Sequence, residues 1–127
     1  CGAARRAGAE ARIAEARAAL LAKADAAMDA SPLDPLAVLK RLGEVMPDDA
    51  IIIEELLSSG MNVVRSLLPA TRPDSWFGMR GGGIGVALPQ AAAIKLAKPD
   101  RPVVALSGDG SLMYSAAALW TLAHYRL

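Results

Sequence analysis

The sequence predicts an α/β fold, in which a partial parallel sheet is flanked by helices and preceded by an alanine-rich linker helix. Short apolar runs rich in β-branched residues alternate with helical stretches, and the connections between them are short. Such alternation is typical of parallel sheets covered by helices. The apolar runs end in turns rich in glycine, serine or acidic residues, and alanine dominates the first thirty residues.

Composition and charge exclude several classes of function. The chain has 127 residues, a formal net charge of +1 and an apolar fraction of 54%, so it is neither a basic nucleic-acid binder nor a disordered polyelectrolyte. The only cysteine, Cys1, excludes an internal disulfide framework, and the only histidine, His124, excludes multi-histidine metal chemistry. No apolar stretch is long enough to cross a bilayer. We therefore expect no nucleic-acid partner, no membrane partner and a cytoplasmic location.

The first elements along the chain are two helices. Residues 2–30 carry Glu and Arg at helical spacings without a proline, which predicts one long helix. Asp34 before Pro35 is a good N-cap followed by a first-turn proline, which predicts the start of a second helix. The apolar face of the first helix is mostly alanine, so we expect this helix to be a linker or a strut that lies on a neighbouring element.

Strands and helices alternate in the rest of the chain. Residues 50–53, Ala-Ile-Ile-Ile, predict a strand buried on both faces, as in a parallel sheet. The further elements are expected to be a helix from Ser58 to Leu68, a strand at 75–77, a helix from about 86 to 98, a second buried strand at 103–106, and a final helix from about Met113.

Three turns leave the carboxyl ends of these strands, at residues 54–60, 78–85 and 107–111. All three are rich in glycine, serine or acidic residues. Ligands of open α/β sheets bind beyond the carboxyl ends of the strands. The sequence therefore predicts a binding site where these three turns converge.

The turn Ser107-Gly108-Asp109-Gly110-Ser111 joins a strand to a helix. Its glycines allow a ligand to approach the main chain, and the start of a helix favours an anion such as phosphate. Asp109 would repel a phosphate unless a divalent cation lay between them, and Mg²⁺ prefers this combination of carboxylate and phosphate oxygens. The alternative interpretation is a plain turn with Asp109 as a cap.

Residues 81–85, Gly-Gly-Gly-Ile-Gly, form the second glycine-rich segment. Their spacing fits neither the dinucleotide-binding G-x-G-x-x-G pattern nor a Walker A loop. The glycines indicate that something flat or bulky approaches the backbone, with Ile84 presented as the one large side chain. The alternative interpretation is a glycine-rich hinge.

Glu54 and Glu55 end the first predicted strand. Paired carboxylates in such a place bind a cation or act as acid and base. Neighbouring residues on a strand point in opposite directions, so these two are not expected to share one proton.

These motifs together resemble a known family. The segment from about Pro35 to Leu127 resembles the C-terminal, diphosphate-binding domain of thiamine diphosphate-dependent enzymes, with the benzoylformate decarboxylase and acetolactate synthase branch most similar. The resemblance rests on Gly-Asp-Gly-Ser after Val-Val-Ala-Leu-Ser, on Gly-Gly-Ile-Gly-Val-Ala-Leu-Pro and on Ala-Leu-Trp-Thr-Leu-Ala-His-Tyr, at residues 108–111, 82–89 and 118–125.

The resemblance implies thiamine diphosphate and Mg²⁺ as cofactors and assigns roles to individual residues. Asp109 would be a Mg²⁺ ligand. Gly82 would contact the aminopyrimidine through its carbonyl group, and Ile84 would lie between the two cofactor rings and enforce a bent conformation. The cofactor would supply the chemistry and the protein would orient it. Further cofactor contacts would come from Ser58, Gly83, Gly108, Gly110, Ser111 and Tyr114.

The family also has parts that are absent from these residues, namely an Asn metal ligand well beyond the Gly-Asp-Gly aspartate and an activating Glu in a separate domain. The resemblance thus implies that residues 1–34 form a linker helix from a preceding domain, and that residues 35–127 form the N-terminal part of the diphosphate-binding domain, truncated at its C-terminus. We therefore expect a fragment, inactive alone, of a 2-keto acid decarboxylase or carboligase that is a homodimer or homotetramer when complete. The alternatives are a non-catalytic phosphate- or cation-binding α/β module and a purely structural α/β domain.

Overall fold

The computed structural model describes residues 2–60, 63–68, 72–79 and 81–127, and these residues form two compact units. The first unit combines the described residues of 1–45 and 59–69, and the second combines those of 46–58 and 70–127. Cys1, and residues 61–62 of the helix expected from Ser58, lie outside the described residues.

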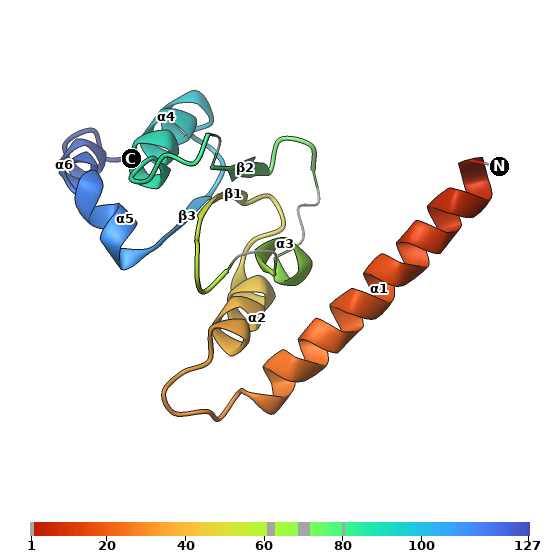
Figure 1. Ribbon diagram of the computed structural model, residues 1–127. Helices are drawn as coiled ribbons and strands as arrows, with labels where there is room; N and C mark the ends of the chain where they lie inside the picture. Colours follow the sequence, from red (N-terminus) through yellow and green to blue (C-terminus); the bar gives the residue numbers. More distant parts are fainter. Residues whose placement is uncertain (1, 61–62, 69–71, 80) are drawn as a thin grey trace. The chain divides into compact units, whose positions relative to one another are not determined.

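Three helices that contact one another make up the first unit: α1 (Gly2–Ala26), α2 (Pro35–Val45) and α3 (Val64–Leu67), shown in Figure 1. The long alanine-rich helix is confirmed but ends earlier than residue 30, in a turn where the Ala27 N–H donates to the Ala24 carbonyl at 3.2 Å. Ala24 is its only buried residue, and most of its other residues are exposed.

The predicted start of α2 is confirmed, because the Asp34 carboxylate accepts a hydrogen bond from the Leu36 N–H at 2.8 Å. An ion pair of 2.8 Å between Lys40 and Asp25 joins α2 to the last turns of α1. Where α2 meets α3, a side chain at Gly43 would lie 2.9 Å from the Leu67 carbonyl oxygen. Glycine at this position therefore permits the close packing of these two helices.

The helix expected from Ser58 to Leu68 is wrong at its start. Residues 58–60 form a turn, and α3 begins only at Val64. The Val63 N–H, just before α3, donates to the Gly60 carbonyl at 3.0 Å. Serine and glycine are weak helix formers, so nothing local extends the helix backwards through residues 58–60.

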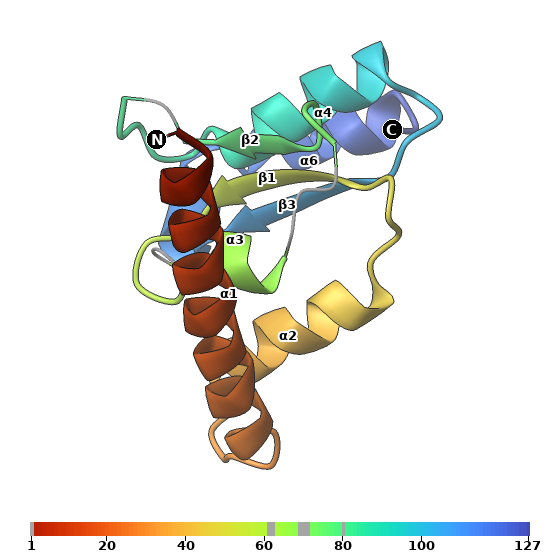
Figure 2. The same ribbon diagram turned by 90° about the vertical axis from the view of Figure 1, so that its right-hand side faces the viewer.

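The second unit is built on a parallel sheet of three strands, which confirms the predicted fold class. Its strands β1 (Ile51–Glu55), β2 (Trp76–Gly78) and β3 (Val103–Ser107) lie in the order β2-β1-β3. Figure 2 shows the strands side by side beneath two helices. Ile51, Ile52 and Ile53 in the central strand are each at most 1% exposed. The β-branched run at 50–53 is thus the buried strand that the sequence predicts.

The strand at 103–107 departs from expectation. It was expected to be buried, but every residue of β3 is only half-buried, as is every residue of β2. Each of these strands pairs with β1 alone among the described strands. An edge strand of a parallel sheet has the same apolar composition as a central one, so composition does not reveal its position.

Helix α4 (Ala87–Ala97) packs on β1 and β3, and α6 (Ala117–His124) lies beside α4 (Figure 2). The small residues Ala87 and Ala91 bring α4 close to Ile53 in the core of this unit. The final helix expected from Met113 is two helices instead, α5 (Asp109–Tyr114) and α6, because the chain leaves the helical conformation at Ser115. No described helix is both long and apolar enough to span a membrane.

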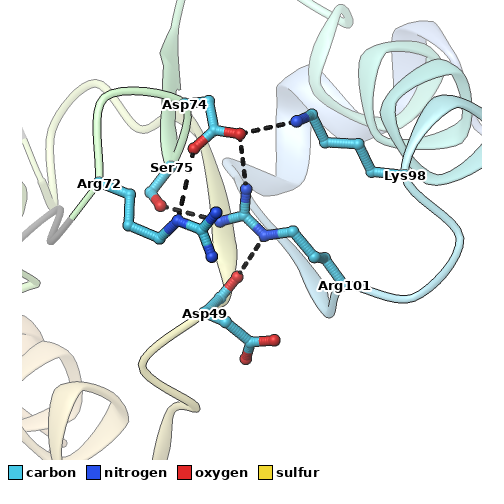
Figure 3. Close-up of polar contacts among 6 residues, drawn as sticks. All are labelled: Asp49, Arg72, Asp74, Ser75, Lys98 and Arg101. Atoms are coloured by element: carbon cyan, nitrogen blue, oxygen red, sulfur yellow. Dashed lines mark hydrogen bonds and ion pairs between the residues drawn. The ribbon is translucent and has the colours of Figure 1, made fainter.

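Arg101 ties the segments at the amino ends of the strands together (Figure 3). Its guanidinium group donates to the Asp49 carbonyl at 2.7 Å, to the Asp74 carboxylate at 2.9 Å and to the Ser75 hydroxyl at 2.9 Å. The side chain is only 12% exposed, so these three bonds satisfy a largely buried cation.

Asp74 is the acidic centre of the same group of side chains. It also accepts a hydrogen bond of 2.6 Å from Lys98, and Arg72 lies 3.8 Å away (Figure 3). The hydrogen bond from Lys98, together with the positive charges of Arg101 and Lys98, lowers the pKa of Asp74 from 3.8 to about 2, against a raising effect of desolvation. The carboxylate is therefore ionised at neutral pH, with its positive partners already in place.

Candidate functional site

The three strands end within one residue of one another at the carboxyl edge of the sheet. The register pairs Glu54 with Gly78, the last residue of β2, and pairs Glu55 with Ser107, the last residue of β3. The turns that leave these strands therefore begin side by side. This register brings the starts of the three turns together, as the sequence predicts.

The turn after β3 passes directly into α5. Gly108 is extended, with φ −69° and ψ 151°, and occupies the N-cap position without a side-chain cap. Asp109 is the first helical residue and is exposed, and its carboxylate accepts one hydrogen bond, from the adjacent Gly110 N–H at 2.9 Å. The alternative of Asp109 as the cap is thus not realised, because Gly108 holds that position. A side chain at Gly110 would meet nothing within 4 Å, so the space beside this turn is open.

The glycine-rich segment after β2 has a backbone that other residues would adopt only under strain. Gly81, Gly82 and Gly85 have positive φ angles of 75°, 70° and 82°. A side chain at Gly81 or Gly82 would meet nothing within 4 Å. Gly83 is exposed as well, and Ile84 is 40% exposed. Ile84 is thus presented at the surface of this segment, as its position among glycines suggests.

The structure brings the two glycine-containing motifs into contact. A side chain at Gly85 would lie 2.6 Å from the Tyr114 Cβ and 3.4 Å from the Ser111 carbonyl oxygen. The backbone at Gly85 therefore lies directly against α5. Ser111 is buried there, whereas the Tyr114 side chain is 74% exposed. Ser58 lies exposed in the turn that follows β1, at the same edge of the sheet.

Glu55 lies in this region too, in the turn expected to converge there, but the sequence does not predict its contacts with the glycine-rich segment and α4. It is 1% exposed, and its carboxylate accepts hydrogen bonds from two backbone groups of the glycine-rich segment and α4. One donor is the Gly85 N–H, and the other is the Ala87 N–H at 2.6 Å. Glu54 is half-buried, and alternation along the strand directs the two carboxylates to opposite sides, as expected.

A signal for this contact is present in the sequence of α4. A helix start leaves N–H groups unpaired, and a nearby Ser, Thr, Asp or Asn usually accepts from one of them. The N-cap here is Val86, which provides no side-chain hydrogen bond, and the first turn holds no acidic residue. A missing local cap followed by an apolar helix indicates an acceptor from elsewhere in the chain. The only acids at the end of the central strand are Glu54 and Glu55.

The donor groups at this edge fit a magnesium-bound diphosphate better than a metal ion alone. Within the described ranges, no three His, Cys, Asp or Glu side chains gather in a way that could hold a metal ion. Asp109 offers one exposed carboxylate next to open backbone at Gly110. Mg²⁺ is commonly bound by one or two carboxylates together with phosphate oxygens and water. One exposed carboxylate beside open backbone therefore suits a cation shared with a bound anion, and the space beside Gly81 and Gly82 is open as well.

Comparison with known families gives a match over much of the chain. The model of the C-terminal thiamine pyrophosphate-binding domain of thiamine pyrophosphate enzymes matches residues 58–127. This range contains the glycine-rich segment, the Gly-Asp-Gly turn and both helices that follow it.

Individual relatives agree with this match. Benzoylformate decarboxylase of Pseudomonas aeruginosa is 36% identical over 101 residues, which are 80% of this chain and 19% of the relative. The acetolactate synthase large subunit IlvG of Mycobacterium tuberculosis is 36% identical over 118 residues, which are 90% of this chain and 21% of the relative. The chain thus spans about a fifth of the length of these relatives.

A solved structure resembles the fold as well. An X-ray structure from Mycobacterium smegmatis, assigned to the thiamin diphosphate-dependent enzymes, superposes with a TM-score of 0.71 and 40% sequence identity. The match covers 76% of this chain and 19% of the other.

Proposed function

The chain belongs to the thiamine pyrophosphate enzyme family, and from this premise we propose that it contributes the diphosphate and metal site of a 2-keto acid decarboxylase or carboligase. Thiamine diphosphate is the cofactor of the family, whose members use it with Mg²⁺. When bound, it supplies the carbon centre that attacks a keto acid and accepts the electrons released on decarboxylation. The part of the chain that carries the site is residues 35–127, and residues 1–34 serve as a linker helix.

The observation that carries this proposal is the exposed Asp109 carboxylate at the carboxyl edge of the sheet, beside an open glycine backbone. Asp109 would hold Mg²⁺, and the main chain of Gly108 and Gly110 would face the diphosphate. Ser111, Tyr114 and Ser58 would add further diphosphate contacts.

The glycine-rich segment would hold the ring system of the cofactor. Nothing lies within 4 Å of a side-chain position at Gly82, whose carbonyl group would contact a ring, and Gly83 would lie next to it against the cofactor. Ile84, the one large exposed side chain of this segment, would pack between the rings and enforce their bent arrangement. These residues orient and enclose the cofactor. The keto acid is the substrate of the parent enzyme, which we propose works as a homodimer or homotetramer.

Isothermal titration of the purified chain with thiamine diphosphate tests this proposal. Binding should require Mg²⁺, and Asp109→Ala should weaken it by more than about tenfold, because a charge-assisted contact is lost. Asp100→Ala is the matched control. Asp100 is an exposed aspartate in the turn after α4, so its removal should leave the affinity unchanged.

Each outcome decides between the proposal and its alternatives. Metal-independent binding of phosphate compounds would favour a non-catalytic binding module instead. Equal binding by Asp109→Ala and the unaltered chain would remove Asp109 from the metal site and contradict the proposal.

A further inference from the structure

Glu55 is a buried carboxylate whose two oxygen atoms both bind the segment that carries Ile84. One oxygen accepts from the Gly85 N–H and the other from the Ala87 N–H, and the side chain is 1% exposed. A buried charge is stable only when it is paired or well hydrogen-bonded, and here both acceptors point at backbone N–H groups. The contact joins the end of the central strand to a segment thirty residues later.

The start of α4 depends on this distant acceptor. Val86 supplies no cap from its side chain, and Pro89 has no N–H of its own. The carboxylate also places a negative charge at the positive end of α4, which stabilises the helix start. A change at Glu55 therefore acts first on the backbone from Gly85 to Ala87.

Ile84 is directly attached to the backbone that Glu55 holds. Gly85 keeps a positive φ of 82° while its backbone lies against Tyr114 of α5. Fixing the N–H groups of Gly85 and Ala87 on one rigid carboxylate therefore limits the directions in which Ile84 projects.

We propose that Glu55 is a positioning residue that holds the glycine-rich segment, and with it Ile84, in the conformation that receives the ring system of the cofactor. This inference rests on the proposed function, and it assigns Glu55 no contact with the cofactor. It separates two tasks within the site: Asp109 and the turn around it bind the diphosphate, and Glu55 arranges the segment that meets the rings.

Hydrogen exchange in the unaltered chain gives the first test and needs no variant. The Gly85 and Ala87 amides should exchange at least about tenfold more slowly than those of the exposed residues Gly81 and Gly83, since a buried acceptor protects them. Equal exchange at all four amides would overturn the proposal.

Glu55→Gln gives the second test, with Glu54→Gln as the matched control. Glutamine keeps the shape of the side chain but replaces one acceptor oxygen with a donor, so one of the two N–H groups loses its partner. Glu54 carries the same charge on the same strand, but its carboxylate is directed to the other side. Exchange at Gly85 and Ala87 should accelerate about tenfold in Glu55→Gln and less than twofold in Glu54→Gln, with the β1 amides unchanged in both.

Two ligands distinguish positioning from a general structural role. The purified variants are titrated with thiamine diphosphate and with inorganic pyrophosphate, each in the presence of Mg²⁺. Glu55→Gln should weaken thiamine diphosphate binding about tenfold and leave pyrophosphate binding within twofold of the unaltered chain. Asp109→Ala should weaken both ligands alike.

The outcomes separate this inference from the proposed function. If the unaltered chain binds neither ligand, the proposed function fails and the positioning role fails with it. If the chain binds both but Glu55→Gln weakens both equally, or weakens neither, the proposed function stands and the positioning role is overturned. Should Glu55→Gln not fold, Glu55→Asp keeps the charge but shortens the reach, and the same selective loss is expected.

Discussion

The two edges of the parallel sheet use charged residues in opposite ways. At the amino edge, Arg101 and Lys98 both bind the carboxylate of Asp74, at 2.9 and 2.6 Å (Figure 3). At the carboxyl edge, Asp109 is exposed, and its carboxylate accepts only from the adjacent Gly110 N–H among the hydrogen bonds of the described residues. An aspartate carboxylate is thus paired with cationic side chains at the amino edge and left accessible at the carboxyl edge.

This difference shows how a small sheet can separate stability from binding. Charged side chains that pair with one another hold segments together, but their hydrogen-bonding positions are then not available to a ligand. A carboxylate surrounded by glycines adds little to stability and keeps its oxygens available. Glu55 lies at the carboxyl edge, but both of its carboxylate oxygens accept hydrogen bonds from backbone N–H groups, so they are not available to a ligand. Removing the paired charges around Asp74 should therefore change stability, and removing the accessible charge of Asp109 should change affinity.

The largest effect on stability is expected from Gly85→Ala, because the glycine-rich segment packs closely against α5 at this position. The new Cβ would lie 2.6 Å from the Tyr114 Cβ, and alanine would have to adopt a φ of 82°. Backbone strain and overpacking together should lower the free energy of unfolding by about 3 kcal/mol. Chemical denaturation measures the loss.

Gly82→Ala is the control for Gly85→Ala. Its φ of 70° is similar, but nothing lies within 4 Å of the new side chain, so only about 1 kcal/mol of backbone strain should remain. If the free energy of unfolding fell equally in the two variants, the contact between Gly85 and α5 would add no steric cost to the backbone strain.

At the amino edge, Arg101→Ala should lower the free energy of unfolding by about 2 kcal/mol, because three hydrogen bonds of a largely buried guanidinium disappear. Affinity for Mg²⁺ and thiamine diphosphate, measured by titration on the folded variant, should not change. Arg72→Ala is the control, since Arg72 is 55% exposed and 3.8 Å from the same Asp74, and exposed pairs contribute about 0.5 kcal/mol or less. A loss of cofactor affinity in Arg101→Ala would contradict the separation of the two edges.

One part of the pH dependence of stability should originate at the amino edge. The folded pKa of Asp74 is lowered from 3.8 to about 2, mainly by Lys98, so its stabilising contribution is present above pH 4 and is lost as the pH falls towards 2. The difference in thermal midpoint between the unaltered chain and Asp74→Asn should stay constant from pH 7 to pH 5 and shrink between pH 4 and pH 2. If the difference in thermal midpoint were unchanged at pH 2, the contribution of Asp74 to stability would not depend on its ionised carboxylate and its ion pairs.

Sequence patterns predicted the elements of the sheet well because they depend on local chemistry. The β-branched run at 51–53, the cap at Asp34 and the glycine turns each have a local cause, and all occur where expected. The close alignment of the strand ends follows from parallel pairing, which also explains why the candidate site residues gather at one edge.

Features that depend on tertiary context were missed. No glycine or proline marks the break at Ser115 between α5 and α6, and the composition of β3 does not reveal that only one described strand pairs with it. The contact of Glu55 with Ala87 spans thirty-two residues, so only the missing cap of α4 indicates it.

The smallest change in stability is expected from Asp109→Asn. Asparagine keeps an oxygen that can accept from the Gly110 N–H, and the exposed carboxylate has no ion pair among the described residues. Loss of its charge near the start of α5 should lower the free energy of unfolding by about 0.5 kcal/mol or less. Because Mg²⁺ binds a carboxylate far better than a neutral amide, affinity for thiamine diphosphate should nevertheless fall by more than about tenfold. Denaturation and titration of the same preparation check both values. A stability loss as large as that of Arg101→Ala would show that Asp109 is a structural residue, and the contrast between the two edges would then be wrong.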